Sequence, residues 1–290
     1  MDDKNLKEIF ALVRLIDEPD QEIYKLVREK ILTHGIEAVS FLEKAWDNDP
    51  NKIVQDRLEE IIHTIQFNNI QIELKKWKDI GSNNLLLGYI LITKYQYPEF
   101  DEEKVRLELD RIKQDIWLEL NDELTGFEKI KTINRILFDL YKFEGNTANM
   151  YSPINSYLIN LLETKKGNQI SLSLLYLILA QMLNLPVYGV NLPEHFVLAY
   201  MNEFCEVDSE KIDSVIFYIN PYSKGIIFTS REIDIYLKQL KIDPIKSYYL
   251  PCSNIDIIIR LLKNLIFSYE KLNQKNKVEE LEELIKLLES

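Results

Sequence analysis

His195 has the surroundings best suited to acid–base chemistry among the three histidines of this chain. It follows a Pro-Glu pair and begins an apolar run, HFVLAY, that is typical of a β-strand. His34 stands beside a glycine at an expected helix end, where a cation is favoured, and His63 lies inside an expected helix. Structural roles are the simpler interpretation for those two, so we look for a site between residues 167 and 222.

Two polar residues in this range could act together with His195. Ser171 stands at the expected N-terminus of a buried helix, where the helix dipole favours negative charge. Asn220, in the sequence NPY, ends a later strand and could orient an imidazole through an amide hydrogen bond. A serine nucleophile with a histidine base and an asparagine partner would suit acyl transfer. The simpler interpretation of Ser171 is that it only caps the helix.

Cys205 is the cysteine closest to His195 in sequence, and its expected orientation is unfavourable. If residues 195–208 form a hairpin that turns at Met201-Asn202, Leu198 pairs with Cys205. Successive side chains of a strand point to opposite faces, so this register turns the thiol away from the imidazole. A shift of one residue in the turn would instead place the thiol on the same face as the imidazole.

The same register makes Asp208 a second candidate partner of His195, because it places the two residues opposite each other. Cys252, the other cysteine, follows a proline in a distant loop and is expected to be incidental. Two cysteines cannot build a disulfide framework, which fits a reducing compartment.

The elements that would position these residues follow an α+β order. The run ISLSLLYLILAQML, residues 170–183, is apolar throughout and too short to span a bilayer, so it predicts a core helix. Four short runs with the composition of strands follow it, and they predict an antiparallel meander. These runs are Val187 to Asn191, Phe196 to Tyr200, Phe204 to Val207 and Val215 to Ile219.

The remaining sequence is predicted to be mostly helical. Residues 6–79 show short amphipathic helices separated by the turns DEPD, HG and NDP, a pattern that resembles HEAT-type repeats. We predict a HEAT-like helical lobe over residues 1–80, a core domain with a helical extension over residues 81–250, and C-terminal helices over residues 251–290.

Composition narrows the classes of function. The 290 residues include 35 Lys and Arg against 47 Asp and Glu, a formal charge of −12, which opposes binding to nucleic acid. No apolar run is long enough to span a membrane, and the acidic start does not resemble a signal peptide, so we expect a cytoplasmic protein. No phosphate loop, dinucleotide fingerprint or metal-ligand cluster is present, so no cofactor or metal is expected.

Several uncommon motifs, taken together, resemble those of a known family. The central one is KKGNQISLSLLYLILAQMLNLPVYGVNLPEHFVLAY. RLIDEPD, LLLGYILITKYQYPEFD and GFEKIKTINRILFDLYKFEGN precede it, and YINPYSKGIIFTSREI follows it. Over residues 14–240 the chain resembles the bacterial SirB family of transglutaminase-like proteins. The resemblance implies a transglutaminase/papain-like core with a small antiparallel sheet.

The resemblance also implies a Cys-His-Asp triad, from which this sequence departs. The superfamily places the cysteine at the start of the core helix, where the helix dipole and a basic partner generate a thiolate. Here that helix starts with Gln169-Ile170-Ser171 and has no cysteine. The histidine matches His195, and Asn220 stands where the superfamily often has the aspartate of an Asp-Pro pair.

Three hypotheses remain open from the sequence. In the first, the protein is a degenerate, non-catalytic transglutaminase-like protein that binds a peptide or protein partner. In the second, it is a hydrolase or acyltransferase that uses Ser171, His195 and Asn220. In the third, it is an interaction scaffold in which His195 is only a buried hydrogen-bonding residue. The distance between the Ser171 hydroxyl and the imidazole discriminates among them, because direct proton transfer requires hydrogen-bond reach.

Overall fold

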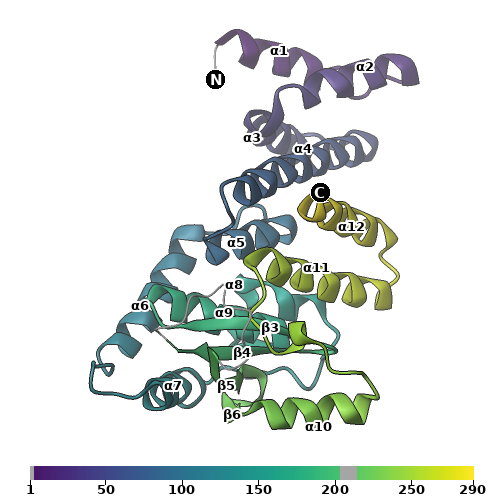
Figure 1. The fold of residues 1–290 in the computed structure, drawn as a ribbon. Helices are drawn as coiled ribbons and strands as arrows, with labels where there is room; N and C mark the ends of the chain where they lie inside the picture. Colours follow the sequence, from purple (N-terminus) through teal and green to yellow (C-terminus); the bar gives the residue numbers. More distant parts are fainter. Residues whose placement is uncertain (1–2, 203–213) are drawn as a thin grey trace. The chain divides into compact units, whose positions relative to one another are not determined.

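The chain is mostly helical with one small antiparallel sheet, so the prediction of an α+β fold is confirmed. The computed structural model describes residues 3–202 and 214–290 (Figure 1). The chain divides into two compact units, with the boundary between residues 76 and 77. No helix in these described ranges is long and apolar enough to cross a membrane.

The N-terminal unit is built from amphipathic helices whose apolar faces form one core. Buried Ile16, Ile31 and Leu58 belong to this core. Asp20 starts the second helix by accepting two backbone N–H groups on its side chain. The predicted helices are present, and their likeness to HEAT repeats stays a prediction. The elements are α1 (Asp3–Val13), α2 (Gln21–Leu32), η1 (Gly35–Ala38), α3 (Val39–Asn48) and α4 (Lys52–Asp79), which crosses the boundary.

The C-terminal unit contains helices that pack around α9, which is buried over most of its length. Each of the residues from Ile170 to Ala180 is buried, which confirms the predicted core helix. The hydroxyls of Tyr157 and Tyr269 lie 2.7 Å apart and join the start of α8 to α11. The helices are α5 (Leu85–Gln96), α6 (Glu102–Trp117), α7 (Gly126–Asn134), η2 (Arg135–Leu140), η3 (Pro153–Ser156), α8 (Leu158–Thr164), α9 (Gln169–Met182), α10 (Ser230–Leu240), η6 (Lys246–Tyr248), α11 (Asn254–Lys271) and α12 (Lys275–Glu289).

Four antiparallel strands form the sheet in the order β3-β4-β5-β6. A further short pair, β1 and β2, runs parallel. The predicted strands before and after residue 195 and the one at residue 215 are confirmed, and the predicted strand from Phe204 to Val207 lies outside the described residues. The elements are β1 (Glu144–Gly145), β2 (Lys166–Gly167), β3 (Val187–Leu192), β4 (His195–Met201), β5 (Val215–Asn220), η5 (Pro221–Ser223) and β6 (Ile226–Phe228).

Helices cover both faces of this sheet (Figure 1). On one face, Val197 of β4 packs in a cluster with Ile233 and Leu237 of α10. On the other face, the hydrogen of Gly189 leaves room for Phe196 and Ile257, because a Cβ there would lie 2.6 Å from the Phe196 ring and 3.0 Å from Ile257. Helix α9 contacts β3, β4 and α11, and therefore belongs to the same layer as α11.

The register expected for residues 195–208 is wrong. Leu198 lies opposite Gly189 of β3 and Ile219 of β5, not opposite Cys205. Both edges of β4 are occupied, and the strand that returns beside it begins only at Val215, well beyond the Met201-Asn202 turn signal. Cys205 and Asp208 lie outside the described residues, and none of the described pairings of β4 supports Asp208 as a partner of His195.

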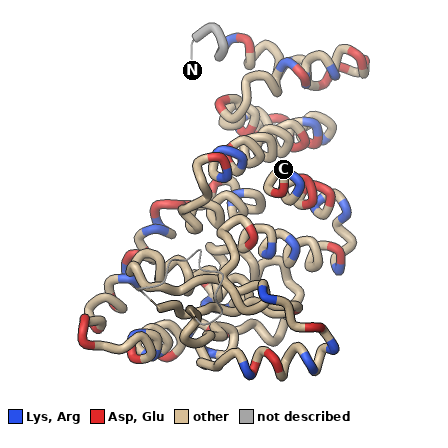
Figure 2. The backbone as a smooth tube through the Cα atoms, in the orientation of Figure 1, with Lys and Arg blue, Asp and Glu red and all other residues tan. Residues whose placement is uncertain are grey.

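Charged residues of both signs are distributed over the helices of both units (Figure 2). Ion pairs connect some of them, such as the pair between Lys165 and Glu108 at 3.1 Å. The net negative charge is therefore spread along the chain rather than gathered in one segment.

A buried amide holds the turn between β5 and β6 in place. Asn134, at the end of α7, donates to the carbonyl oxygen of Gly225 at 2.7 Å and accepts from the Tyr176 hydroxyl at 3.0 Å. Gly225 has a φ of +71° and an added Cβ would collide with Asn134, so glycine is required there. The asparagine thus links α7, α9 and the hairpin that leads into β6.

Replacement of this asparagine should strongly destabilise the C-terminal unit. Asn134→Ala leaves a buried tyrosine hydroxyl and a buried carbonyl without their partner, which should cost about 2–4 kcal/mol of unfolding free energy. Chemical denaturation of both proteins measures this loss. Asp139→Ala, at an exposed position of η2, is the matched control and should change stability by less than about 0.5 kcal/mol. Equal stabilities of the two variants would contradict the assigned role of Asn134.

Candidate functional site

Ser171 lies in the first turn of α9, where it completes a reciprocal capping pair with Asn168. The Asn168 side chain accepts from the Ser171 backbone N–H at 2.9 Å, and the Ser171 hydroxyl accepts from the Asn168 backbone N–H at 2.9 Å. The same hydroxyl donates to the Asn168 carbonyl oxygen at 3.2 Å. Asn168 is therefore the N-cap residue and Ser171 its partner three positions later, a capping box.

The Ser171 side chain is completely buried within a polar network. The Asn168 amide also donates to the Ser156 hydroxyl at 2.8 Å and to the Asn264 side chain at 2.9 Å. These bonds tie the start of α9 to η3 and α11. Gly167, the residue before the cap, leaves no space for a side chain because a Cβ would collide with Ser171.

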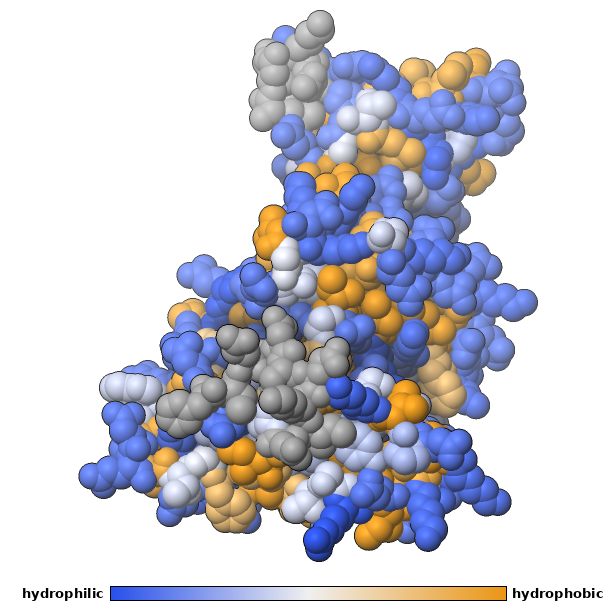
Figure 3. Space-filling view, in the orientation of Figure 1, coloured by the Kyte–Doolittle hydropathy of each residue, from blue (hydrophilic) through white to orange (hydrophobic). Residues whose placement is uncertain are grey.

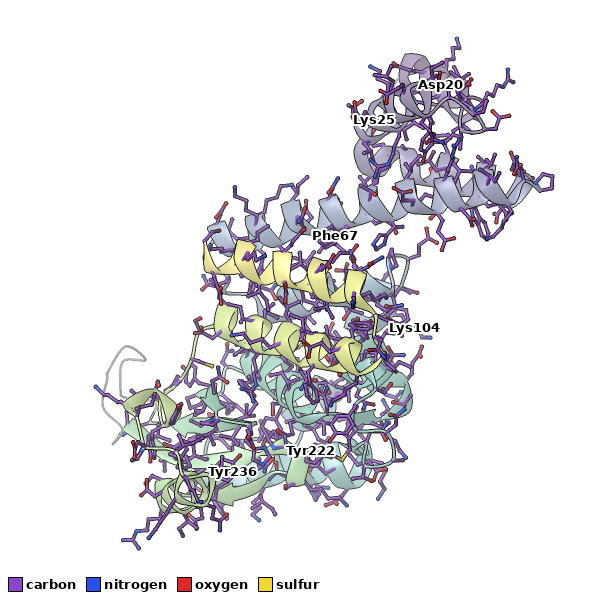
Figure 4. All side chains as sticks on the ribbon, turned by 90° about the vertical axis from the view of Figure 1, so that its right-hand side faces the viewer. Asp20, Lys25, Phe67, Lys104, Tyr222 and Tyr236 are labelled. Atoms are coloured by element: carbon purple, nitrogen blue, oxygen red, sulfur yellow. The ribbon has the colours of Figure 1, made fainter. Side chains whose placement is uncertain are left out.

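His195 begins β4 directly after a tight turn. It pairs with Leu192 across that turn, and Glu194 adopts a φ of +57°, a left-handed conformation that favours glycine or asparagine. The imidazole lies 5.5 Å from the ring of Tyr236, ring centre to ring centre. Tyr236 projects from α10 (Figure 4) and donates its hydroxyl to the Pro193 carbonyl at 3.0 Å. His195 therefore points to the α10 face of the sheet.

The environment of His195 favours its neutral form. Burial lowers the pKa of the imidazole, and the nearby Arg260 guanidinium lowers it further, while Glu194 acts in the opposite direction. Arg260 is itself held by a hydrogen bond to the Asn191 side chain at 3.2 Å. The Nδ1 atom of His195 is buried and has no hydrogen-bond partner in the described part of the chain.

Asn220 lies at the end of β5 and uses its side chain to turn the chain. Its amide oxygen accepts from the Ser223 backbone N–H at 3.3 Å and caps the short helix η5. No hydrogen bond between Asn220 and His195 is present among the residues that the structure describes. The two residues nevertheless line one cavity, so the structure brings them to the same site.

We call this space the His195 cavity, and its volume is about 200 Å³. It lies between the sheet and α10, and most of its lining is apolar. Its lining residues are Leu192, His195, Val197, Asn220, Ser223, Ile226, Phe228, Glu232, Ile233 and Tyr236. Glu232 is already engaged, because its carboxylate accepts from the Thr229 backbone N–H in the capping box of α10.

Ser171 does not line the His195 cavity. Helix α9 packs on the α11 side of the sheet, whereas the imidazole faces α10, so the strands lie between Ser171 and His195. Cys252 is also poorly suited to attack a substrate, because burial raises the pKa of its thiol to about 12. No cluster of potential metal ligands occurs within residues 3–202 and 214–290.

Sequence reasoning did not identify Tyr236 as part of this site, nor Arg260 as a charge that affects His195. The apolar spacing of Ile233 and Leu237 was the signal available for a helix that covers the sheet. Nothing local indicates that Tyr236 from α10 contacts the imidazole or that the charge of Arg260 from α11 lowers its pKa, because both effects depend on long-range packing.

Comparison with known proteins places these elements in a family. The family described as "Transglutaminase-like superfamily" matches residues 103–263, which run from α6 into α11 and include Ser171, His195 and Asn220. F-box only protein 21 of Mus musculus is 34% identical over 110 residues, which is 38% of this chain and 17% of that protein. The chain thus spans less than a fifth of the length of that relative.

Bacterial relatives match over more of their length. A UPF0162 protein of Xylella fastidiosa (strain 9a5c) is 24% identical over 215 residues, which is 70% of this chain and 73% of that protein. A UPF0162 protein of Pasteurella multocida is 31% identical over 104 residues, 36% of each chain. No solved structure matches the chain.

The lowered pKa of His195 gives the unfolding free energy a defined pH dependence. Below the pKa of an unfolded histidine, about 6.5, the unfolded chain binds a proton at this residue, whereas the native imidazole has a lower pKa and stays neutral to a lower pH. The stability that neutral His195 contributes is therefore complete above that pH and is lost as the pH falls toward the native pKa. Urea denaturation measures the unfolding free energy at pH about 7.5 and about 5. The decrease in this free energy between the two pH values should be larger for wild type than for His195→Gln. Equal losses, or a native pKa above about 6.5 by NMR titration, would contradict this assignment.

Proposed function

Because the chain belongs to the transglutaminase-like superfamily, we propose that it is a non-catalytic member that binds a peptide or protein partner at the His195 cavity. On the motifs around His195 and Asn220 we further assign it to the SirB family. The bacterial UPF0162 relatives are compatible with that assignment.

The position of Ser171 is the observation that carries this proposal. An attacking hydroxyl needs a base within about 2.6–3.2 Å and an open path to the substrate. The Ser171 hydroxyl is completely buried, and it both accepts from and donates to the backbone of Asn168. The sheet lies between it and His195. A structural role at the start of α9 accounts for every bond that this hydroxyl makes to the described residues.

The dimensions and lining of the His195 cavity support binding of a side chain. A volume of about 200 Å³ is below the ~300–1,000 Å³ usual for small-molecule sites, and it suits one anchoring side chain of a larger partner. The walls are mostly apolar, and His195, whose lowered pKa favours the neutral form, adds one polar group to the lining. A buried apolar anchor with one polar contact is a common arrangement at protein interfaces.

A fluorophosphonate probe tests the non-catalytic part of the proposal. Wild type and Ser171→Ala should both remain unlabelled, under conditions that fully label a known serine hydrolase, because the Ser171 hydroxyl is buried and bonded to the Asn168 backbone. Ser173→Ala, a buried serine of the same helix, is the matched control. Labelling of wild type and of Ser173→Ala that disappears in Ser171→Ala would establish Ser171 as a nucleophile and refute the proposal.

Selection of peptides from a displayed library of short random sequences tests the binding part. Wild type should enrich peptides, and Ser223→Trp, which fills the His195 cavity, should weaken their binding by at least about tenfold. Ile216→Trp places the same ring at a position of β5 that is 56% exposed and does not line the cavity. It should bind within about twofold of wild type. A wild-type protein that enriches no peptide, or equal effects of the two substitutions, would contradict a binding role for this cavity.

A further inference from the structure

The two edges of the sheet differ in how they are covered. Along the outer edge of β3, the backbone N–H of Cys252 donates to the Gly189 carbonyl oxygen at 2.8 Å, so the chain itself occupies that edge. The opposite edge strand, β6, pairs with β5 on its inner side only, as far as the described residues show. Alternate residues of an edge strand direct their N–H and C=O groups outward, where they can bind another strand.

Strand β6 is short, with three residues, but lacks the other features that usually protect an exposed edge. Besides keeping edge strands short, proteins commonly place charged residues, proline or a β-bulge there. The sequence of β6 is Ile-Ile-Phe, its pairing with β5 is regular, and Ile226 is 61% exposed. Apolar residues are visible at the surface of the C-terminal unit among hydrophilic ones (Figure 3). An uncharged, partly exposed strand is suited to receive an additional strand.

The His195 cavity extends to this edge. Its lining comes in succession from His195 of β4, Asn220 of β5, and Ile226 and Phe228 of β6. Ile226 and Phe228 are two residues apart and share the face that α10 covers. A strand added beside β6 would direct every second side chain to this same face, next to the cavity.

We propose that the partner binds as an extended peptide segment that pairs with β6 as a fifth strand and inserts an apolar side chain into the His195 cavity. This inference rests on the proposed function and specifies its binding mode. Backbone groups on the β6 edge supply the affinity, and the cavity selects the side chain. An apolar side chain is favoured because the walls are mostly apolar, the imidazole is neutral, and the Glu232 carboxylate is engaged with Thr229.

An N-methyl scan of the peptides that wild type enriches tests this mode. Each peptide is synthesised with a single backbone amide methylated at successive positions, and its affinity is measured by titration. Methylation should weaken binding by about tenfold or more at alternate positions and have little effect between them, because only alternate amides of a strand face its neighbour. Hydrogen exchange at Ile226–Phe228 should slow when the unmethylated peptide is added.

Two variants complete the test. Ile226→Lys, which charges the edge, should weaken the peptide by about tenfold or more, whereas Ile216→Lys, at a similarly exposed position of β5, should not. Enriched peptides whose affinity shows no alternating pattern would overturn the added strand and leave peptide binding intact. No enrichment at all would refute the proposed function itself. A wild-type dimer that becomes monomeric in Ile226→Lys, measured by light scattering, would assign the edge to a second copy and overturn the inference.

Discussion

Alternation of side chains along β4 is the constraint on which the rest of this site depends. Because neighbouring residues of a strand face opposite sides, His195 and Val197 must share one face while Phe196 takes the other. Helix α10 packs on the first face, and α9 with α11 on the second. Helix α9, which would carry a nucleophile, therefore packs against one face of the sheet, whereas the histidine side chain of β4 points to the other face.

The serine at the start of α9 has a structural explanation. A thiol is a weak hydrogen-bond partner, whereas a serine hydroxyl both accepts and donates strongly. At position 171 the hydroxyl uses both abilities on the backbone of Asn168, and the Asn168 amide extends the network to Ser156 and Asn264. Serine at this position thus stabilises the start of α9. The same network holds α9 against α11, in the helical layer that covers one face of the sheet.

The elements with strong local patterns could be predicted from the sequence, and those fixed by distant contacts could not. The apolar run from Ile170 and the strands on each side of His195 are visible in the sequence because burial dictates their composition. The return strand was assigned too early, since the local turn signal at Met201-Asn202 does not reveal which later segment completes the pairing. The contact of Tyr236 with the imidazole and the electrostatic effect of Arg260 on it depend on the packing of α10 and α11, which no local spacing encodes.

The region recognisable as a superfamily domain is smaller than the unit that folds. The match ends at residue 263, in the middle of α11, which continues to Lys271. Beyond that point Leu265 and Tyr269 are buried, and the Tyr269 hydroxyl contacts that of Tyr157 at the start of α8. A fragment cut at the boundary of the match would lose this contact and expose the apolar face of the remaining helix. The domain defined by sequence similarity therefore ends at residue 263, whereas the domain defined by packing continues through the rest of α11.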